Sequence, residues 1–217
     1  MVGNLLGVRW PDAAWRTQDV DVAEHLQVAV PDQEADVPAA LESLQMGFVP
    51  VPQLDSRQPS SSFRVRGQLL QVDLLTPGSD RDRSPVYIPR FKAAAAPIKH
   101  LSLVMRDACP AVAIDSGAVV ITVPDPARFA LHKLFVSQTR SVVQHTKTGK
   151  DLHQAGLLLE VLAKERPEEL EHAAKSFAAS GPVVTSRIRR ALERVVKRWP
   201  AAGYGALLVR PLLPAAG

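Results

Sequence analysis

Apolar and polar residues alternate through the first part of the chain with the period of two that a β-strand requires. Asp19-Val20-Asp21-Val22 alternates acid with valine, so both acids project from one face of a strand. Two apolar runs, over residues 63–65 and 69–75, flank Arg66-Gly67-Gln68 and predict a hairpin whose glycine supplies the tight turn. Four more extended segments are expected, over residues 26–30, 86–88, 112–114 and 118–123, the last two as a hairpin.

A helix and a loop-like stretch interrupt these strands. Asp36 followed by Val37-Pro38 has the form of an N-cap with proline in the first turn, and predicts a helix that runs to about Met46. Residues 78–97 are rich in Pro, Ser, Arg and Ala. They are expected to form an excursion over the surface, apart from the short extended piece at 86–88.

Beyond Asp125-Pro126 the apolar positions recur with the helical period instead. The fold class is therefore expected to be α/β (α+β), with a mixed β-sheet flanked by helices over residues 1–124 and a helical region over 125–217. Helices are expected over about 126–141, 150–165, 168–179 and 185–199. The second of these places five apolar residues on the face that would pack against a core, at Leu152, Ala155, Leu158, Leu159 and Leu162.

The composition is that of a folded globular protein. A chain of 217 residues suits one α/β unit or a small domain with a helical appendage, and 46% hydrophobic with 22% charged residues excludes intrinsic disorder. No apolar stretch approaches the roughly 18 residues of a spanning helix, so no membrane segment and no signal peptide are expected. Cys109 is the only cysteine, which excludes an intramolecular disulfide and a cysteine-based zinc site and favours a reducing cytoplasm.

Three carboxylates form the strongest candidate for a chemical site. Asp19 and Asp21 would stand roughly 6 to 7 Å apart on one strand, and Asp73 lies in an apolar strand that could run about 5 Å to the side. An Asp-x-Asp pair alone is most often an exposed strand edge. An acid within an apolar strand is harder to explain in that way, because burying an unpaired carboxylate costs several kcal/mol by order of magnitude. Together the three acids predict a site for Mg²⁺ or Mn²⁺.

The residues around these acids resemble a known family. Arg16-Thr17-Gln18-Asp19-Val20-Asp21 and Val72-Asp73-Leu74-Leu75-Thr76-Pro77 together resemble the nucleotidyltransferase superfamily that includes DNA polymerase β. The similarity runs from about Leu5 to about Leu162 and includes Pro126 to Leu134, a more specific stretch than the acid pair. Within the superfamily the chain is most similar to a bacterial nucleotidyltransferase-fold family that is distantly related to the toxins of abortive-infection systems.

The resemblance implies roles for particular residues. Asp19 and Asp21 would be the paired metal ligands and Asp73 the third catalytic acid, which could also accept the proton of the attacking hydroxyl. The resemblance implies Arg16, Thr17, Lys133, Lys150 and Asp151 as substrate-binding residues. Arg140 joins them because Lys133 and Arg140 are expected two helical turns apart on one face of the same helix. The basic residues among them would contact the phosphates of a nucleoside triphosphate (NTP), with a solvated basic face as the equal alternative.

One departure from the superfamily bears on activity. Its members normally carry a Gly-Ser or Gly-Thr turn that cradles the phosphates upstream of the acid pair, and no such dipeptide precedes Asp19 in this chain. A chain that lacks the N-terminal helix, or a degenerate copy of the enzyme, would explain this. Loss of that helix would also expose apolar sheet surface that a second copy could cover, as an oligomer.

Other residues give weaker signals. The histidines form no convincing zinc pattern, and Ser60-Ser61-Ser62 has no glycine elbow of the hydrolase type. The segment from Thr146 to Lys150 lacks the spacing of a phosphate loop and is interpreted as a helix-entry loop that touches phosphate. The net charge of +4 and six basic residues on the last helix permit RNA binding, but a solvated face is the more usual reading of such a run. These residues are Arg187, Arg189, Arg190, Arg194, Lys197 and Arg198.

The sequence therefore supports two functional hypotheses. The first is a metal-dependent nucleotidyltransferase that moves a nucleoside monophosphate from an NTP to a hydroxyl group on RNA, protein or a small molecule. The alternative is a non-catalytic or degenerate binding or regulatory protein of the same fold, as in a toxin–antitoxin system. Magnesium-dependent binding of an NTP would distinguish the two.

Overall fold

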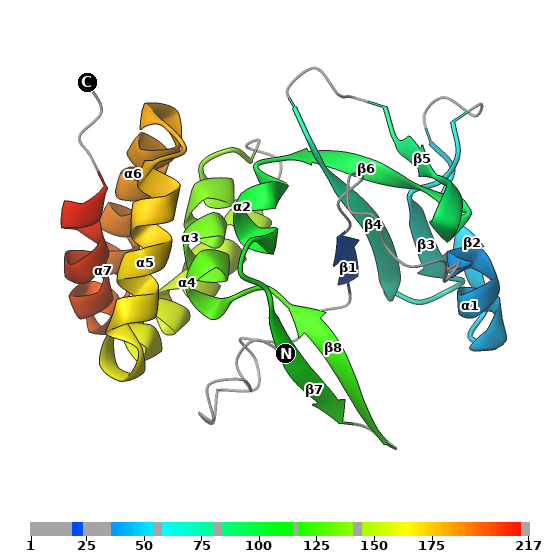
Figure 1. Cartoon of the computed structure of the whole chain (residues 1–217), viewed down its shortest axis with the longest axis horizontal. Coiled ribbons are helices and arrows are strands. Elements are labelled where there is room, and N and C mark those ends of the chain that lie inside the picture. The colour runs from blue at the N-terminus through cyan, green and yellow to red at the C-terminus, as the bar shows by residue number, and fades with distance from the viewer. Residues whose placement is uncertain are drawn as a thin grey trace. The chain divides into compact units, whose positions relative to one another are not determined.

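The computed structural model of the chain describes residues 19–23, 36–53, 58–79, 84–114, 117–140 and 145–213. The chain divides into two units, one from Thr17 to Ser102 and one that begins at Leu103 (Figure 1). The sequence places the boundary near Pro124; the second hairpin, expected in the first region, groups here with the helices. None of the helices in the described ranges has the length and apolar character to span a membrane.

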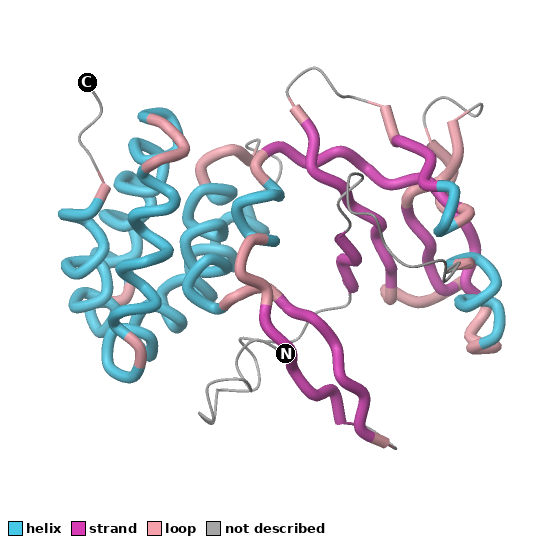
Figure 2. The backbone as a smooth tube through the Cα atoms, viewed as in Figure 1, coloured by secondary structure: helices cyan, strands magenta, loops and turns pink. Residues whose placement is uncertain are grey.

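The first unit is built on a mixed sheet whose central strand is β4 (Figure 2). The strand order is β2-β3-β4-β6-β5, and β1 also pairs with β4. β4 runs parallel to β1 and to β6 and antiparallel to β3. Since β1 and β3 pair with the same residues of β4, they lie on its opposite edges. The strands are β1 (Asp19–Ala23), β2 (Phe48–Pro50), β3 (Ser62–Val65), β4 (Gln71–Gly78), β5 (Val86–Ile88) and β6 (Ala93–Lys99).

The two faces of this sheet differ in character because side chains alternate along each strand. On β4, Val72, Leu74 and Thr76 are buried, whereas the residues between them are only partly buried. The buried face packs on helix α1 (Val37–Ser43) and on the 3-10 turn Pro89–Phe91, with Leu41 and Phe91 in the same apolar cluster. The opposite face carries the polar residues of β1, β3 and β4.

Most of the local predictions in this unit are confirmed. The Asp36 carboxylate accepts a hydrogen bond from the Ala39 backbone N–H at 2.9 Å and so caps α1. The helix ends at Ser43, about three residues earlier than expected. The hairpin between β3 and β4 turns where expected, with Gly67 at a φ of 74° that glycine adopts at little cost. The predicted strand over 26–30 lies outside the described residues.

The surface excursion expected over residues 78–97 is wrong in its second half. Residues Ala93–Lys99 form β6, and Ala94 and Ala95 are fully buried. Alanine has a low strand propensity, so the sequence gives no strand signal here, but burial between packed elements overrides that preference. Pro97 lies in the part of β6 that pairs with β4 but not with β5. One edge of β6 has no partner strand at this position, and proline, which has no N–H, is tolerated there.

The second unit is helical and carries one hairpin (Figure 2). The hairpin expected over 112–123 is confirmed, with a longer first strand and the second strand at its predicted bounds. Its elements are α2 (Leu101–Met105, at the junction of the units), β7 (Cys109–Ile114), β8 (Ala118–Val123), α3 (Pro126–Ser137), α4 (His145–Glu165), α5 (Pro167–Ala178), α6 (Pro182–Arg198) and α7 (Gly203–Val209), with 3-10 turns at Pro200–Ala202 and Arg210–Leu212.

The core of the helical unit forms where the sequence predicts it. All five residues of the expected face of α4 are at most 4% exposed, and they pack in one cluster with α3, α5 and α6. The segment from Thr146 to Lys150, expected as a loop, is instead the first part of α4. The expectation was wrong because Gly149 disfavours a helix by only about 1 kcal/mol, which the buried face beyond it outweighs. Helix α7 was not predicted.

Candidate functional site

The acids of the predicted site lie in register across neighbouring strands. Asp21 on β1 pairs with Asp73 on β4, and Asp73 in turn pairs with Ser62 on β3. One step back along the sheet, Asp19 pairs with Gln71, which pairs with Arg64. Residues in register project from the same face, so the polar face carries two adjoining rows that each cross three strands. The sheet thus brings Asp73 beside the Asp-x-Asp pair, as the sequence predicts.

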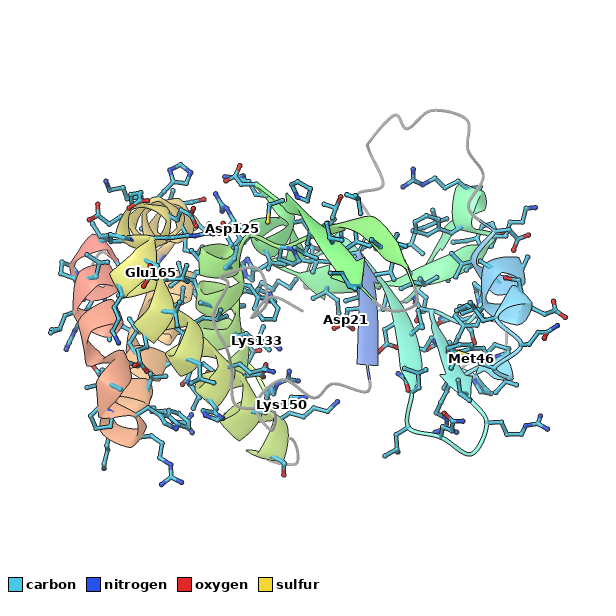
Figure 3. All side chains as sticks on the ribbon, turned by 90° about the horizontal axis from the view of Figure 1, so that it is seen from below. Asp21, Met46, Asp125, Lys133, Lys150 and Glu165 are labelled. Carbon is cyan, nitrogen blue, oxygen red and sulfur yellow. The ribbon has the colours of Figure 1, made fainter. Side chains whose placement is uncertain are left out.

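The environments of Asp21 and Asp73 differ. Asp21 is exposed on β1 (Figure 3), whereas Asp73 is half-buried in the middle of the sheet. The Ser62 hydroxyl donates a hydrogen bond to Oδ1 of Asp73. The Gln71 side-chain amide donates to the same oxygen from 2.8 Å. Asp73 is therefore held by neutral donors rather than by a cation, and its negative charge remains available to a ligand.

The donor chemistry of this face fits a divalent metal ion. Carboxylate oxygens are the ligands that Mg²⁺ and Mn²⁺ prefer, and Mg²⁺ usually takes one or two protein carboxylates together with substrate phosphates. In-register partners on adjacent strands lie about 4.8 Å apart, so one ion can contact both Asp21 and Asp73. Among the side chains that the structure describes, which do not include that of Asp19, no three acids, histidines or cysteines cluster around a common metal position.

Two of the predicted phosphate-binding residues of the helical unit, Lys133 and Arg140, meet at one buried acid. The Asp151 side chain, on α4, is 3% exposed and accepts from Lys133 Nζ at 3.0 Å and from Arg140 Nε at 2.6 Å. Lys133 Nζ also lies 5.1 Å from the centre of the Phe129 ring. Lys150, the fourth predicted residue, is exposed on the same helix (Figure 3).

The expected helical relationship between Lys133 and Arg140 is wrong. They were expected two turns apart on one helix, but α3 ends at Ser137, where the backbone N–H groups of Gln138 and Thr139 bond back to the last turn. Arg140 therefore lies beyond the helix. The two cations still converge, because both pair with Asp151. Together they carry one positive charge more than the acid neutralises.

Two predicted substrate-binding residues, Arg16 and Thr17, lie outside the described residues. Sequence reasoning missed Ser62 and Gln71, although a signal for both exists. Gln71 stands two residues before Asp73 on the same strand, which puts both on one face. The hairpin register that sets Ser62 opposite Asp73 follows from the turn at residues 66–70, once its length is known.

A second polar cluster lies within the helical unit, around a cavity of about 360 Å³. Its centre is Arg128, which is 1% exposed and pairs with Asp107 and with the Ser176 hydroxyl. The buried arginine therefore has hydrogen-bond partners within the protein. Burial raises the pKa of the nearby Cys109 thiol, and the negative charges of Asp125 and Glu169 raise it further. The cavity is lined by Asp107, Asp125, Arg128, Glu168, Glu169 and His172.

Comparison with known proteins adds one finding. A family model described as "Nucleotidyltransferase" matches residues 1–179 of the chain. The matched range includes both acid-bearing strands and the segment that carries Lys133, Arg140 and Asp151. No curated protein and no solved structure gives a match.

Proposed function

Because this chain belongs to the nucleotidyltransferase family, we propose that it moves a nucleoside monophosphate from an NTP to a hydroxyl group, with Asp19, Asp21 and Asp73 as metal ligands. The observation that supports this most directly is the in-register pairing of Asp21 with Asp73 on the polar face of the sheet. Two like charges placed directly opposite one another destabilise a sheet, and a cation bound by both carboxylates would remove that repulsion.

The proposed reaction forms one bond and breaks one. The oxygen of the acceptor hydroxyl attacks the α-phosphorus, the bond from that phosphorus to the bridging oxygen of the β-phosphate breaks, and pyrophosphate leaves. We assign Asp73 Oδ2, which accepts neither of the two hydrogen bonds described above, as the acceptor of the hydroxyl proton. A bound divalent ion supplies neutralisation of the triphosphate charge. We propose Asp19 and Asp21 as ligands of that ion, because residues two apart on a strand share a face.

The basic residues of α3 and α4 have the charge to bind the triphosphate. Lys133 and Arg140 share Asp151, and the group of three keeps one net positive charge, so we propose that the two cations contact phosphate while Asp151 holds them. Lys150 is exposed and adds a further cation. Arg16 and Thr17 remain predicted substrate-binding residues. The hydroxyl group that accepts the nucleoside monophosphate would belong to RNA, protein or a small molecule.

A thermal-shift titration tests the proposal. The chain is titrated with each NTP, with and without Mg²⁺, beside the double variant Asp21→Ala/Asp73→Ala and the control Glu42→Ala, which removes an exposed acid of α1. We expect a metal-dependent stabilisation that reaches about 2.7 kcal/mol at a hundredfold excess of NTP over its Kd, remains in the control and disappears in the double variant. Transfer is then followed as pyrophosphate release with RNA, protein and small-molecule acceptors.

The alternative function makes the opposite prediction. A non-catalytic member of the fold, which the missing Gly-Ser or Gly-Thr dipeptide before Asp19 favours, would show no metal-dependent shift at millimolar NTP. A shift without any pyrophosphate release would indicate a nucleotide-binding regulatory protein, such as a member of a toxin–antitoxin pair. Either result would overturn the enzymatic proposal.

A further inference from the structure

Two hydrogen bonds to Asp73 converge on a single oxygen. Ser62 reaches Oδ1 from β3, where it is the register partner of Asp73, and Gln71 reaches it from the same face of β4 at 2.8 Å. The second oxygen, Oδ2, accepts neither of them. A carboxylate that only needed partners for its burial would be served equally well by one donor on each oxygen.

The position of Ser62 indicates which side of the Asp73 carboxylate faces each neighbouring strand. β3, which carries Ser62, and β1, which carries Asp21, lie on opposite edges of β4. Since Ser62 holds Oδ1, that oxygen is committed to the β3 side of the carboxyl group. Gln71 fixes the same oxygen from along the strand, so the two bonds together restrict rotation of the carboxylate. Oδ2 is the oxygen left for chemistry on the face shared with Asp21.

We propose that Ser62 and Gln71 are positioning residues that orient Asp73 for cation binding and proton acceptance. This inference rests on the proposed function, because it assigns the two residues to the same acidic site. Groups that hydrogen-bond to a metal-binding carboxylate fix its orientation, and their loss typically weakens metal affinity or activity by about 10- to 100-fold. The same range is expected here if the carboxylate turns freely without its two donors.

The variants that test this remove one donor at a time. Ser62→Ala deletes the hydroxyl, Ser62→Thr restores it with a side chain suited to a strand, and Gln71→Met keeps the length of the side chain without its amide. Ser61→Ala is the matched control, because the neighbouring Ser61 hydroxyl accepts from Gln53 and has no contact with Asp73. Asp73→Asn marks the complete loss of the site.

Each variant is measured in three ways: Mn²⁺ affinity of the nucleotide-free chain by electron paramagnetic resonance, kcat and KM of nucleotidyl transfer, and the unfolding temperature. We expect Ser62→Ala and Gln71→Met to weaken Mn²⁺ binding and lower kcat by about tenfold each, with KM for the NTP nearly unchanged. Ser62→Thr should recover both values. Ser61→Ala should change only the unfolding temperature, which separates positioning from fold stability.

Two results would overturn the inference in different ways. In the first, Ser62→Ala and Gln71→Met each keep the Mn²⁺ affinity and kcat of the unmodified chain, whereas Asp73→Asn loses both properties. The hydrogen bonds would then not position the acid, while the proposed function would stand. Absence of Mn²⁺ binding and of transfer in the unmodified chain would remove the proposed function, and the inference with it. If Ser62→Ala fails to fold, Gln71→Met alone decides the matter.

Discussion

Asp21 and Asp73 are register partners in the parallel pairing of β1 with β4. Their strands are adjacent, so the two carboxylates stand about 4.8 Å apart at their backbones and project from the same face. Like charges directly opposite one another on neighbouring strands are destabilising. Removal of one of the two charges should therefore relieve this repulsion.

Asp73→Asn should separate stability from ligand binding. Asparagine keeps an oxygen that can accept from Ser62 and Gln71 but removes the negative charge beside Asp21. We expect the free energy of unfolding without divalent ions to be unchanged or raised by up to about 1 kcal/mol, and the Mg²⁺-dependent stabilisation by NTP to be lost. Urea unfolding with and without Mg²⁺ measures both. A loss of stability in the metal-free variant would instead make Asp73 a structural acid.

The acid that joins Lys133 to Arg140 should be a strong determinant of stability. Asp151→Asn leaves two cations side by side, and removing one partner of a buried ion pair costs about 3 kcal/mol or more. Lys133→Met is the comparison, because Asp151 keeps its 2.6 Å contact with Arg140 and the loss should be about 1.5 kcal/mol. Urea unfolding of both variants provides the test. Equal losses would mean that Arg140 alone does not neutralise the acid.

The sheet that carries the site could be predicted from sequence only where its strands alternate. β1 and β4 place acids or polar residues between apolar ones, and their period of two is visible without any structure. β6 is a run of four alanines followed by proline, which has no such period and a low strand propensity. Its strand conformation depends on burial against β4 and β5, and burial is a tertiary property.

The candidate site shows the same division between local and tertiary information. That Asp19 and Asp21 share a face follows from their spacing, and the apolar surroundings of Asp73 identify it as a neighbour. The hydrogen bond from Ser62 depends on the register between β3 and β4. The pairing of Lys133 and Arg140 with Asp151 depends on how α3 and α4 pack, and the sequence alone suggested a shared helical face instead.

The N-cap of α1 predicts a pH dependence of stability. The hydrogen bond from the Ala39 N–H holds the pKa of Asp36 below its usual value, and the contact with Lys92 at 3.2 Å lowers it further. A carboxyl whose pKa is lower in the folded state contributes stability above its unfolded pKa, and this contribution is lost as the pH falls through the folded pKa. Asp36→Asn should therefore unfold with a shallower acid dependence than the unmodified chain.

Unfolding temperatures from about pH 6 to about pH 2 measure this difference. Lys92→Met provides the control for the second cause, and should remove only part of the dependence that Asp36→Asn removes, because the backbone hydrogen bond is the larger cause. Identical curves for Asp36→Asn and the unmodified chain would show that the acid dependence arises at other groups.

The close approach of α7 to α4 predicts opposite effects for two glycine substitutions. A Cβ built on Gly205 would lie 2.5 Å from the backbone oxygen of Leu159, so Gly205→Ala must push α7 away from α4. Overpacking of this kind costs about 1 to 3 kcal/mol. A Cβ on Gly149, on the exposed side of α4, would meet no atom within 4 Å beyond its chain neighbours and the nearby backbone of its own helix. Gly149→Ala should stabilise the chain by up to about 1 kcal/mol, because alanine loses less backbone entropy in a helix.

Urea unfolding of the two single variants and of the double variant tests this contrast. The sites share no contact partner, so their effects should add within about 0.5 kcal/mol. Because the Gly205 clash is with backbone rather than with a side chain, no rotation of a neighbouring group can relieve it. Stability equal to that of the unmodified chain in Gly205→Ala would therefore show that α7 does not lie against α4 in solution at the distance described here.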